Sequence, residues 1–262
     1  MNFNFTLRII LEFLELLLIG IWYYIYNFVL SLSDIKIFFH KPLDYLKLLL
    51  LKFLVFYEYF FLPPRWVVKL EIKKFKISNS ENYTYGETPY VTTYNILKDL
   101  KEITSIENSI FIDLGCGTGK TIFTASILFN LKSIGVDNIL TFINKSNNIK
   151  KILSLFFLLD LRFLKMDVEE FLESKMEELK EKPLIFYITS TAFEENFFRR
   201  IIEKIIDKTS EAYIITVSKP IPRELKQKFL NTPKSLVKLF SKKYYFSWGK
   251  SMAYLYALSS QK

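Results

Sequence analysis

Cysteine and histidine are almost absent from this sequence. Its 262 residues include one cysteine, Cys116, and one histidine, His40. A lone cysteine excludes internal disulfides and cysteine-cluster metal sites. A lone histidine argues against a histidine-based zinc site and against a Ser-His-Asp triad. We therefore expect no metal site, and much hydrolytic chemistry is excluded before any motif is considered.

Glycine and proline are scarce as well, with 7 and 8 residues. This excludes the collagen-like and low-complexity classes of protein. Half of the residues are hydrophobic and 17% are aromatic, so intrinsic disorder is excluded as the dominant state. The length suits one full domain with an appendage.

Acidic residues are nearly missing from the C-terminal segment, residues 216–262. Ten lysines and arginines stand there against one acidic residue, Glu224, whereas residues 81–215 carry 16 basic and 20 acidic residues. Such a basic surface attracts nucleic acid, anionic lipid or an acidic protein, although lysine-rich faces are often merely solvated. We do not favour a nucleic-acid partner for residues 216–262, because no base-stacking platform is evident.

Charge is also missing from an 18-residue run, residues 16–33, near the start of the chain. This length is close to the lower limit of the roughly 17–25 residues that a membrane-spanning helix needs. A second apolar stretch, residues 43–62, is interrupted by four charged residues, which favours an amphipathic helix on a membrane or on the protein. Residues 1–62 are thus expected either to associate with a membrane or to pack on the rest of the chain or in an oligomer.

Two consecutive prolines, Pro63 and Pro64, mark the end of this hydrophobic region. We therefore predict a helical extension over residues 1–65 and a second part over residues 66–262. Four lysines follow the uncharged run closely, whereas one arginine precedes it. Positive flanks stay inside, so a spanning run would leave the rest of the chain cytoplasmic, at the inner face of the membrane.

The chain beyond about residue 66 alternates between short apolar runs and helical patterns. Such alternation predicts an α/β fold with a mostly parallel sheet and right-handed crossovers. Strands are expected over residues 109–114, 132–137, 161–165, 183–189 and 212–217, and a closing strand pair over residues 243–248 and 252–258. Helices are expected over residues 88–100, 120–130, 139–159, 168–181 and 194–208.

The chemical signal is concentrated directly after the first of these strands. Residues 111–119 read Phe-Ile-Asp-Leu-Gly-Cys-Gly-Thr-Gly. Asp113 stands near the end of the strand, and Gly115, Gly117 and Gly119 lead into a helix. These glycines let the backbone adopt positive φ and approach a ligand closely.

Three nucleotide-site patterns compete for this loop. The dinucleotide fingerprint G-x-G-x-x-G needs glycine at position 120, where Lys120 stands. The Walker pattern ends suitably in Gly-Lys-Thr but needs glycine in place of Leu114, and no later strand offers a convincing acidic magnesium partner. The pattern D-x-G-x-G-x-G of S-adenosylmethionine methyltransferases fits at every position. That cofactor has a cationic amino acid portion and no phosphate, which suits a carboxylate at a strand end.

Two later acids support the methyltransferase interpretation. Asp137 ends the second strand, where a carboxylate can accept both ribose hydroxyls. Asp167 follows the third strand, where it can accept from the adenine amino group while Val168 contacts the ring. Either acid alone could be a helix cap or a loop charge. Three acids at the ends of three successive strands are harder to explain in that way, since ligand sites of open α/β sheets lie there.

Further segments resemble one methyltransferase family. Residues 85–88 read Tyr-Gly-Glu-Thr, residues 185–193 Ile-Phe-Tyr-Ile-Thr-Ser-Thr-Ala-Phe, residues 217–220 Val-Ser-Lys-Pro, and residues 247–256 begin Ser-Trp. In this order they resemble the non-SET histone-lysine methyltransferases of the disruptor-of-telomeric-silencing type. The resemblance covers about residues 83–258. It implies a Rossmann-like sheet with helices on both faces and a C-terminal antiparallel hairpin, preceded here by the hydrophobic extension.

The resemblance also implies a site for S-adenosyl-L-methionine. Its cofactor residues would be Tyr85, Gly86, Glu87, Thr88, Asp113, Gly115, Cys116, Gly117, Gly119, Asp137, Asp167 and Val168. The loop from Tyr85 to Glu87 would close over the methionine end of the cofactor. Residues Thr189, Thr191 and Phe193 would line the acceptor side, where the family has a paired asparagine and this chain does not.

We expect transfer of a methyl group to a protein lysine amine. The expected partner is therefore a protein substrate. No dedicated base is evident, and none is needed if the enzyme positions the reactants and excludes water. An RNA or lipid methyltransferase and a non-catalytic, membrane-associated scaffold that retains the fold are the alternatives.

Overall fold

The structure is a computed structural model of the chain. It describes residues 34–75, 86–179, 182–191, 193–225 and 234–260, together with Ile21, Ile25 and Leu32. The predicted membrane-spanning run, residues 16–33, therefore lies outside the described residues except for those three positions. Among the helices that are described, none is long and apolar enough to cross a membrane.

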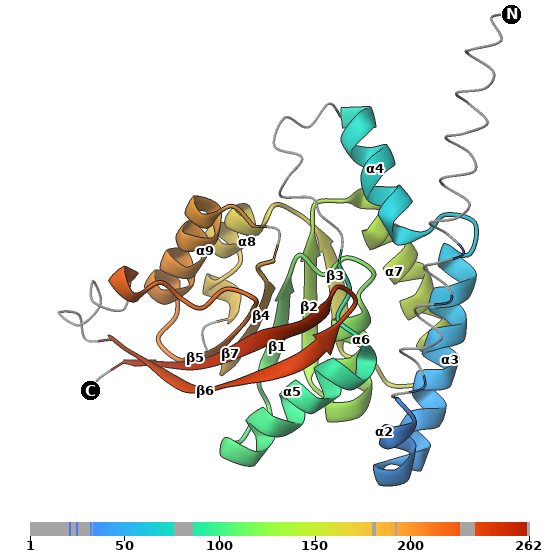
Figure 1. Ribbon diagram of the computed structural model, residues 1–262, viewed down its shortest axis with the longest axis horizontal. Coiled ribbons are helices and arrows are strands. Elements are labelled where there is room, and N and C mark those ends of the chain that lie inside the picture. Colours follow the sequence, from blue (N-terminus) through green and yellow to red (C-terminus); the bar gives the residue numbers. More distant parts are fainter. Residues whose placement is uncertain are drawn as a thin grey trace, which may run out of the picture.

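A seven-stranded sheet of order β3-β2-β1-β4-β5-β7-β6 forms the centre of the fold (Figure 1). Strands β1 to β5 pair in parallel, while β7 pairs antiparallel with both β5 and β6. The strands are β1 Ile110–Leu114, β2 Lys132–Asp137, β3 Leu161–Lys165, β4 Leu184–Thr189, β5 Ala212–Val217, β6 Lys234–Phe246 and β7 Gly249–Ser260. This confirms the predicted Rossmann-like sheet with a closing hairpin. The order reverses between β1 and β4, so a crevice is expected at the carboxyl ends of these strands.

Helices cover both faces of the sheet (Figure 1). On one face, α5 Tyr90–Ile103, α6 Lys120–Phe129 and α7 Leu140–Leu153 pack on the strands, and α2 Ile35–His40, α3 Pro42–Tyr59 and α4 Pro64–Phe75 form a further layer outside these helices. The other face packs against α8 Val168–Ser174 and α9 Glu195–Lys208. The inner strands read as continuous apolar runs because both of their faces are buried.

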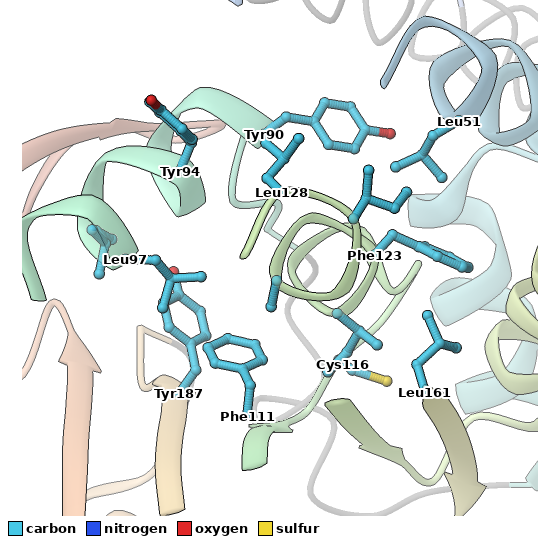
Figure 2. Packing of buried hydrophobic residues seen from close by; sticks show 14 of the residues in the cluster. Leu51, Tyr90, Tyr94, Leu97, Phe111, Cys116, Phe123, Leu128, Leu161 and Tyr187 are labelled. Carbon is cyan, nitrogen blue, oxygen red and sulfur yellow. The ribbon is translucent and has the colours of Figure 1, made fainter. Parts of the chain in front are cut away.

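The described part of the N-terminal region shares its core with the sheet domain. Leu48 and Leu51 on the inner face of α3 are fully buried, and Tyr59 packs on Phe142 of α7 at 6.2 Å between ring centroids. Figure 2 shows Leu51 in the same cluster as Phe123 of α6. Helix α3 thus acts as an additional layer of the domain and not as a detached segment.

Several predicted element boundaries are wrong. Helix α7 ends at Leu153 and not at 159, because the chain turns back there toward the sheet to begin β3. Helix α8 ends at Ser174, and a short 3-10 helix, Glu177–Leu179, follows it and buries Leu179. Both hairpin strands are much longer than expected, since β6 is an edge strand whose exposed lysines conceal it in the sequence.

Candidate functional site

A cavity of about 530 Å³ lies at the carboxyl ends of β1 to β4. The residues predicted for the cofactor and acceptor that line it are Gly86, Glu87, Thr88, Asp113, Gly115, Cys116, Gly117, Asp137, Asp167, Val168, Thr189, Thr191 and Phe193. Gly119 is not part of the lining, and Tyr85 lies outside the described residues. Residues that are up to about 100 positions apart in the sequence are therefore brought around one cavity.

The glycine loop shapes the floor of this cavity. Gly115, Gly117 and Gly119 all have positive φ, and Gly119 begins α6 in the left-handed conformation. A Cβ atom at Gly119 would lie 2.7 Å from the Phe163 ring, so any larger residue would push the loop away from β3. A Cβ atom at Gly115 would meet only Phe193, at 3.8 Å, because the backbone there faces the cavity.

Asp113 is the deepest carboxylate of the site. Its side chain is 3% exposed, and one oxygen, Oδ2, accepts a hydrogen bond from the Thr121 hydroxyl. The other oxygen, Oδ1, is buried and has no hydrogen-bond partner in the described part of the chain. Burial raises the pKa of Asp113 to about 7; the Thr121 hydrogen bond opposes this rise and the Asp137 charge adds to it. A buried oxygen without a partner is costly, and a cationic ligand group would satisfy it.

Asp137 holds the glycine loop against the end of β2. Its Oδ2 accepts from the Gly117 backbone N–H at 2.8 Å, and its Oδ1 accepts from the Ile139 N–H at 2.9 Å. Burial raises the pKa of Asp137 to about 6, while these backbone hydrogen bonds work against the rise. This carboxylate lines the cavity and also fixes the loop that forms its floor.

Asp167 differs from the other two strand-end acids. Its side chain is exposed and caps α8, accepting from the N–H groups of Glu169 at 2.8 Å and Glu170 at 3.4 Å. Asp167 therefore has the helix-cap role that is the alternative to cofactor binding, although Asp167 and Val168 also line the cavity.

Glu87 forms a buried ion pair inside the cavity. Its Oε2 lies 2.6 Å from the Nζ atom of Lys120, and the two side chains are 5% and 8% exposed. Helix α5 begins at Tyr90 without a side-chain cap, so Glu87 is not its capping residue. The carboxylate is therefore directed to the site and not to the adjacent helix.

The turn of the β6–β7 hairpin holds the segment that carries Glu87. The Glu87 N–H donates to the Ser247 hydroxyl at 2.7 Å, and the Ser247 N–H donates to the Glu87 carbonyl at 3.0 Å. A Cβ atom at Gly86 would lie 2.5 Å from the Trp248 ring, so only glycine fits against it. The two motifs, Gly-Glu-Thr and Ser-Trp, are thus parts of one contact.

Hydroxyl groups mark the side of the cavity near Phe193. The Thr191 and Ser218 hydroxyls lie 2.8 Å apart, and the Ser218 and Ser251 hydroxyls lie 2.8 Å apart. Ser218 has a φ of 75°, which is unusual for a non-glycine residue and places its side chain in this chain of hydroxyls. Thr191 directly follows Thr189 and Ser190, which stand where the resembling family has its paired asparagine.

Lys120 is the main site residue that the sequence reasoning missed. The sequence pattern around Lys120 suggests only the lysine of a Walker loop. A charged residue at the first position of a helix that directly follows a glycine loop was a usable signal, because that position faces the loop's ligand. Trp248 and Ser247 were noted as family features, but nothing in their spacing predicts that they contact Glu87.

Comparisons with known proteins place the chain in a family and identify solved structures of similar fold. A family model described as "Histone methylation protein DOT1" matches residues 66–258. Magnesium protoporphyrin IX methyltransferase from Synechocystis PCC 6803 with bound S-adenosylmethionine has a TM-score of 0.50 and 13% identity over 74% of this chain and 97% of that one. The same enzyme with bound S-adenosylhomocysteine has a TM-score of 0.50 and 12% identity over 74% and 100%. No curated protein sequence matches this chain significantly. At such low identity these structures support the fold alone.

Proposed function

This chain belongs to the family of the histone methylation protein DOT1, and on that premise we propose that it methylates a lysine amine of a protein. It is an S-adenosylmethionine-dependent methyltransferase, which is the established part of this function. The lysine acceptor is supported by one observation, the family match over most of the chain. A Synechocystis enzyme of similar fold acts on a porphyrin, so the fold does not identify the acceptor.

We assign the cofactor to the cavity at the ends of β1 to β4. Asp113 and Glu87 would receive the ammonium group of its methionine portion, and the unpartnered Oδ1 atom of Asp113 supports this placement. Asp137 would accept from the ribose hydroxyls, and Asp167 with Val168 would contact the adenine. The bound cofactor supplies an electrophilic methyl group on a sulfonium cation.

The residues around the acceptor side would position the amine and keep out water. Phe193 packs edge-on against Phe197 at 5.1 Å between ring centroids, and Trp248, which also lines the cavity, packs against Gly86. Lysine reacts in its neutral form, and lowering its pKa from about 10.4 to 7 costs roughly 4–5 kcal/mol. A dry channel beside a cation reduces that cost, since both disfavour the charged amine. The hydroxyls of Thr189 and Thr191 would orient the amine for in-line transfer.

The acceptor class can be tested by counting methyl transfer. The protein is incubated with radiolabelled S-adenosylmethionine and a fractionated lysate, and protein, RNA and lipid pools are counted separately. We expect label in protein, recovered as methyl-lysine after acid hydrolysis. Asp113→Asn should abolish the signal, whereas Glu170→Gln, an exposed change on α8, should retain it. Label in RNA or lipid would contradict the lysine proposal, and cofactor binding without any transfer would indicate a scaffold.

We also propose that the outer face of α2 and α3 lies on an anionic lipid surface. This apolar face consists of Phe39, Leu43, Leu46, Phe53 and Tyr57, together with Phe61 just after α3, and these residues are 57–88% exposed. Two features of the chain favour lipid over another occupant. The uncharged run of residues 16–33 directly precedes α2, and α4 exposes Lys69, Lys73 and Lys74. Because four lysines closely follow residues 16–33 and one arginine precedes them, we propose that the protein lies at the cytoplasmic face of its membrane.

Flotation with liposomes tests this surface. The full chain should float with vesicles that contain phosphatidylglycerol and less with neutral vesicles. Replacing Phe53 and Phe61 with Glu should reduce binding about tenfold or more, while Phe156→Glu, an equally exposed apolar position after α7, should not. Unchanged flotation of the double variant would contradict the proposal. If light scattering shows that the unmodified protein is a dimer and the double variant is a monomer, the face is instead a contact between two copies.

A further inference from the structure

One buried lysine stands among the acids of the cavity. The buried charged residues that line it are Glu87, Asp113, Asp137 and Lys120, three acids and one base. Lys120 is the first residue of α6, its side chain is 8% exposed, and its Nζ atom lies 5.6 Å from the Tyr90 ring centroid. A site built only for cations would gain nothing from this charge, because a buried lysine repels a cationic ligand.

The cofactor's methionine end is not purely cationic. It carries an ammonium and a carboxylate on the same carbon atom, so its recognition requires groups of both signs close together. Glu87 and Lys120, at 2.6 Å, provide such a pair, and both line the cavity with Asp113. The N-terminus of α6, which begins at Lys120, adds a partial positive charge at the same place.

We propose that Lys120 binds the carboxylate of the cofactor's methionine portion. Lys120 would thereby make the site select cofactors that retain this carboxylate over decarboxylated ones. The inference rests on our assignment of the methionine end to Asp113 and Glu87, and it is independent of the acceptor. A charge-assisted hydrogen bond in a buried site corresponds to about a tenfold to hundredfold preference.

A competing role for Lys120 is to hold Glu87 in place. In that case Lys120 would be a positioning residue for the ammonium-binding carboxylate and would never contact the cofactor. The two roles differ in what they predict for a ligand that has the ammonium but lacks the carboxylate. Binding of such a ligand would depend on Lys120 only if Lys120 acts through Glu87.

Calorimetry with three nucleoside thioethers separates these roles. S-adenosylhomocysteine has both charged groups, its decarboxylated analogue has the ammonium alone, and 5′-methylthioadenosine has neither. We expect the unmodified protein to bind S-adenosylhomocysteine at least tenfold more tightly than the decarboxylated analogue. Lys120→Met should weaken S-adenosylhomocysteine about tenfold to hundredfold and change the affinity for the analogue by less than about threefold.

Two further variants control this measurement. Lys120→Arg retains the charge and should keep the preference for the carboxylate. Lys145→Met removes a half-buried lysine that pairs with Glu58 outside the cavity, and it should leave all three affinities unchanged. Should Lys120→Met fail to fold because it leaves Glu87 unpaired, Lys120→Gln, which removes the charge but keeps a hydrogen-bond donor for Glu87, takes its place in the same comparison.

The outcomes that overturn the inference are distinct. Equal weakening of S-adenosylhomocysteine and its decarboxylated analogue by Lys120→Met would make Lys120 a positioning residue for Glu87. No preference for the carboxylate in the unmodified protein would also refute the inference. Failure of all three compounds to bind would overturn the assignment of the cavity to the cofactor, not only the role of Lys120.

Discussion

The floor and the rim of the cavity use the same residue type in different ways. On the floor, Asp113 and Asp137 are buried at the ends of β1 and β2, and burial raises the pKa of each. On the rim, Asp167 follows β3, is exposed to solvent and caps α8. The three acids stand at or near the carboxyl ends of three successive strands. Burial, which the sequence pattern does not show, separates the residues expected to dominate binding from the one expected to contribute little.

Replacing Asp113 should have the largest effect. Asp113→Ala removes the buried carboxylate whose Oδ1 atom is available to a cation, and we expect S-adenosylmethionine affinity to fall about 100-fold or more. Calorimetry measures the change, and thermal melting serves as the control for folding. A loss below about threefold would remove the distinction between floor and rim.

Asp137→Ala should have the next largest effect, about 10- to 100-fold on the same affinity. Part of this loss would come from the glycine loop, because Gly117 and Ile139 would lose their hydrogen bonds to this carboxylate. Asp137→Asn keeps an acceptor oxygen and should lose less. If both variants bind S-adenosylmethionine normally, Asp137 has only a structural role.

The raised pKa of Asp113 predicts that cofactor affinity and stability both depend on pH. Below about pH 7 this carboxyl is protonated in the ligand-free protein, so affinity for a cationic cofactor should fall about tenfold between pH 8 and pH 6. The free energy of unfolding should change with pH in the direction opposite to cofactor affinity. Because protonation favours the folded state, the free energy of unfolding should decrease as the pH rises from about 4 to 7.

Asp113→Asn should remove most of this dependence in both measurements. Titration calorimetry at pH 6, 7 and 8 would follow the affinity, and denaturant unfolding between about pH 4 and 7 would follow the stability. A pH profile of the Asn variant that matches that of the unmodified protein would assign the dependence to another group, with Asp137 the next candidate because its pKa is about 6.

Asp167→Ala should have the smallest effect on binding, about threefold or less. It should instead destabilise the protein by about 1 kcal/mol through loss of the α8 cap. Asp167→Ser, which can still cap the helix, should restore most of that stability. A tenfold loss of S-adenosylmethionine affinity for either variant would show that Asp167 contributes to binding as Asp113 and Asp137 do.

The sheet and the floor of the site could be predicted because their signals are local. Buried parallel strands such as Ile110–Leu114 are continuous apolar runs, and the glycine loop requires glycine for reasons of backbone geometry. The strand order then places the strand ends together. Residues 85–88 were recognised only by resemblance, and Tyr85 lies outside the described residues.

The parts that were missed depend on long-range contacts. Most of β6 is half-buried or exposed, and it carries four lysines, so its sequence lacks the apolar pattern of a strand. Its strand conformation depends on pairing with β7. The inner face of α3 contacts α6 and α7, and hydrophobicity alone could not distinguish this face from the outer one. Lys120 was misjudged because its partner, Glu87, is 33 positions away.

The contact between Glu87 and Ser247 has a consequence for the order in which the protein matures. A ribosome produces the glycine loop and Glu87 long before it produces Ser247 and Trp248. Until that turn emerges, β7 cannot insert beside β5, and the Glu87 backbone lacks the two hydrogen bonds that Ser247 makes with it. The cavity therefore becomes complete only when the last hairpin is in place.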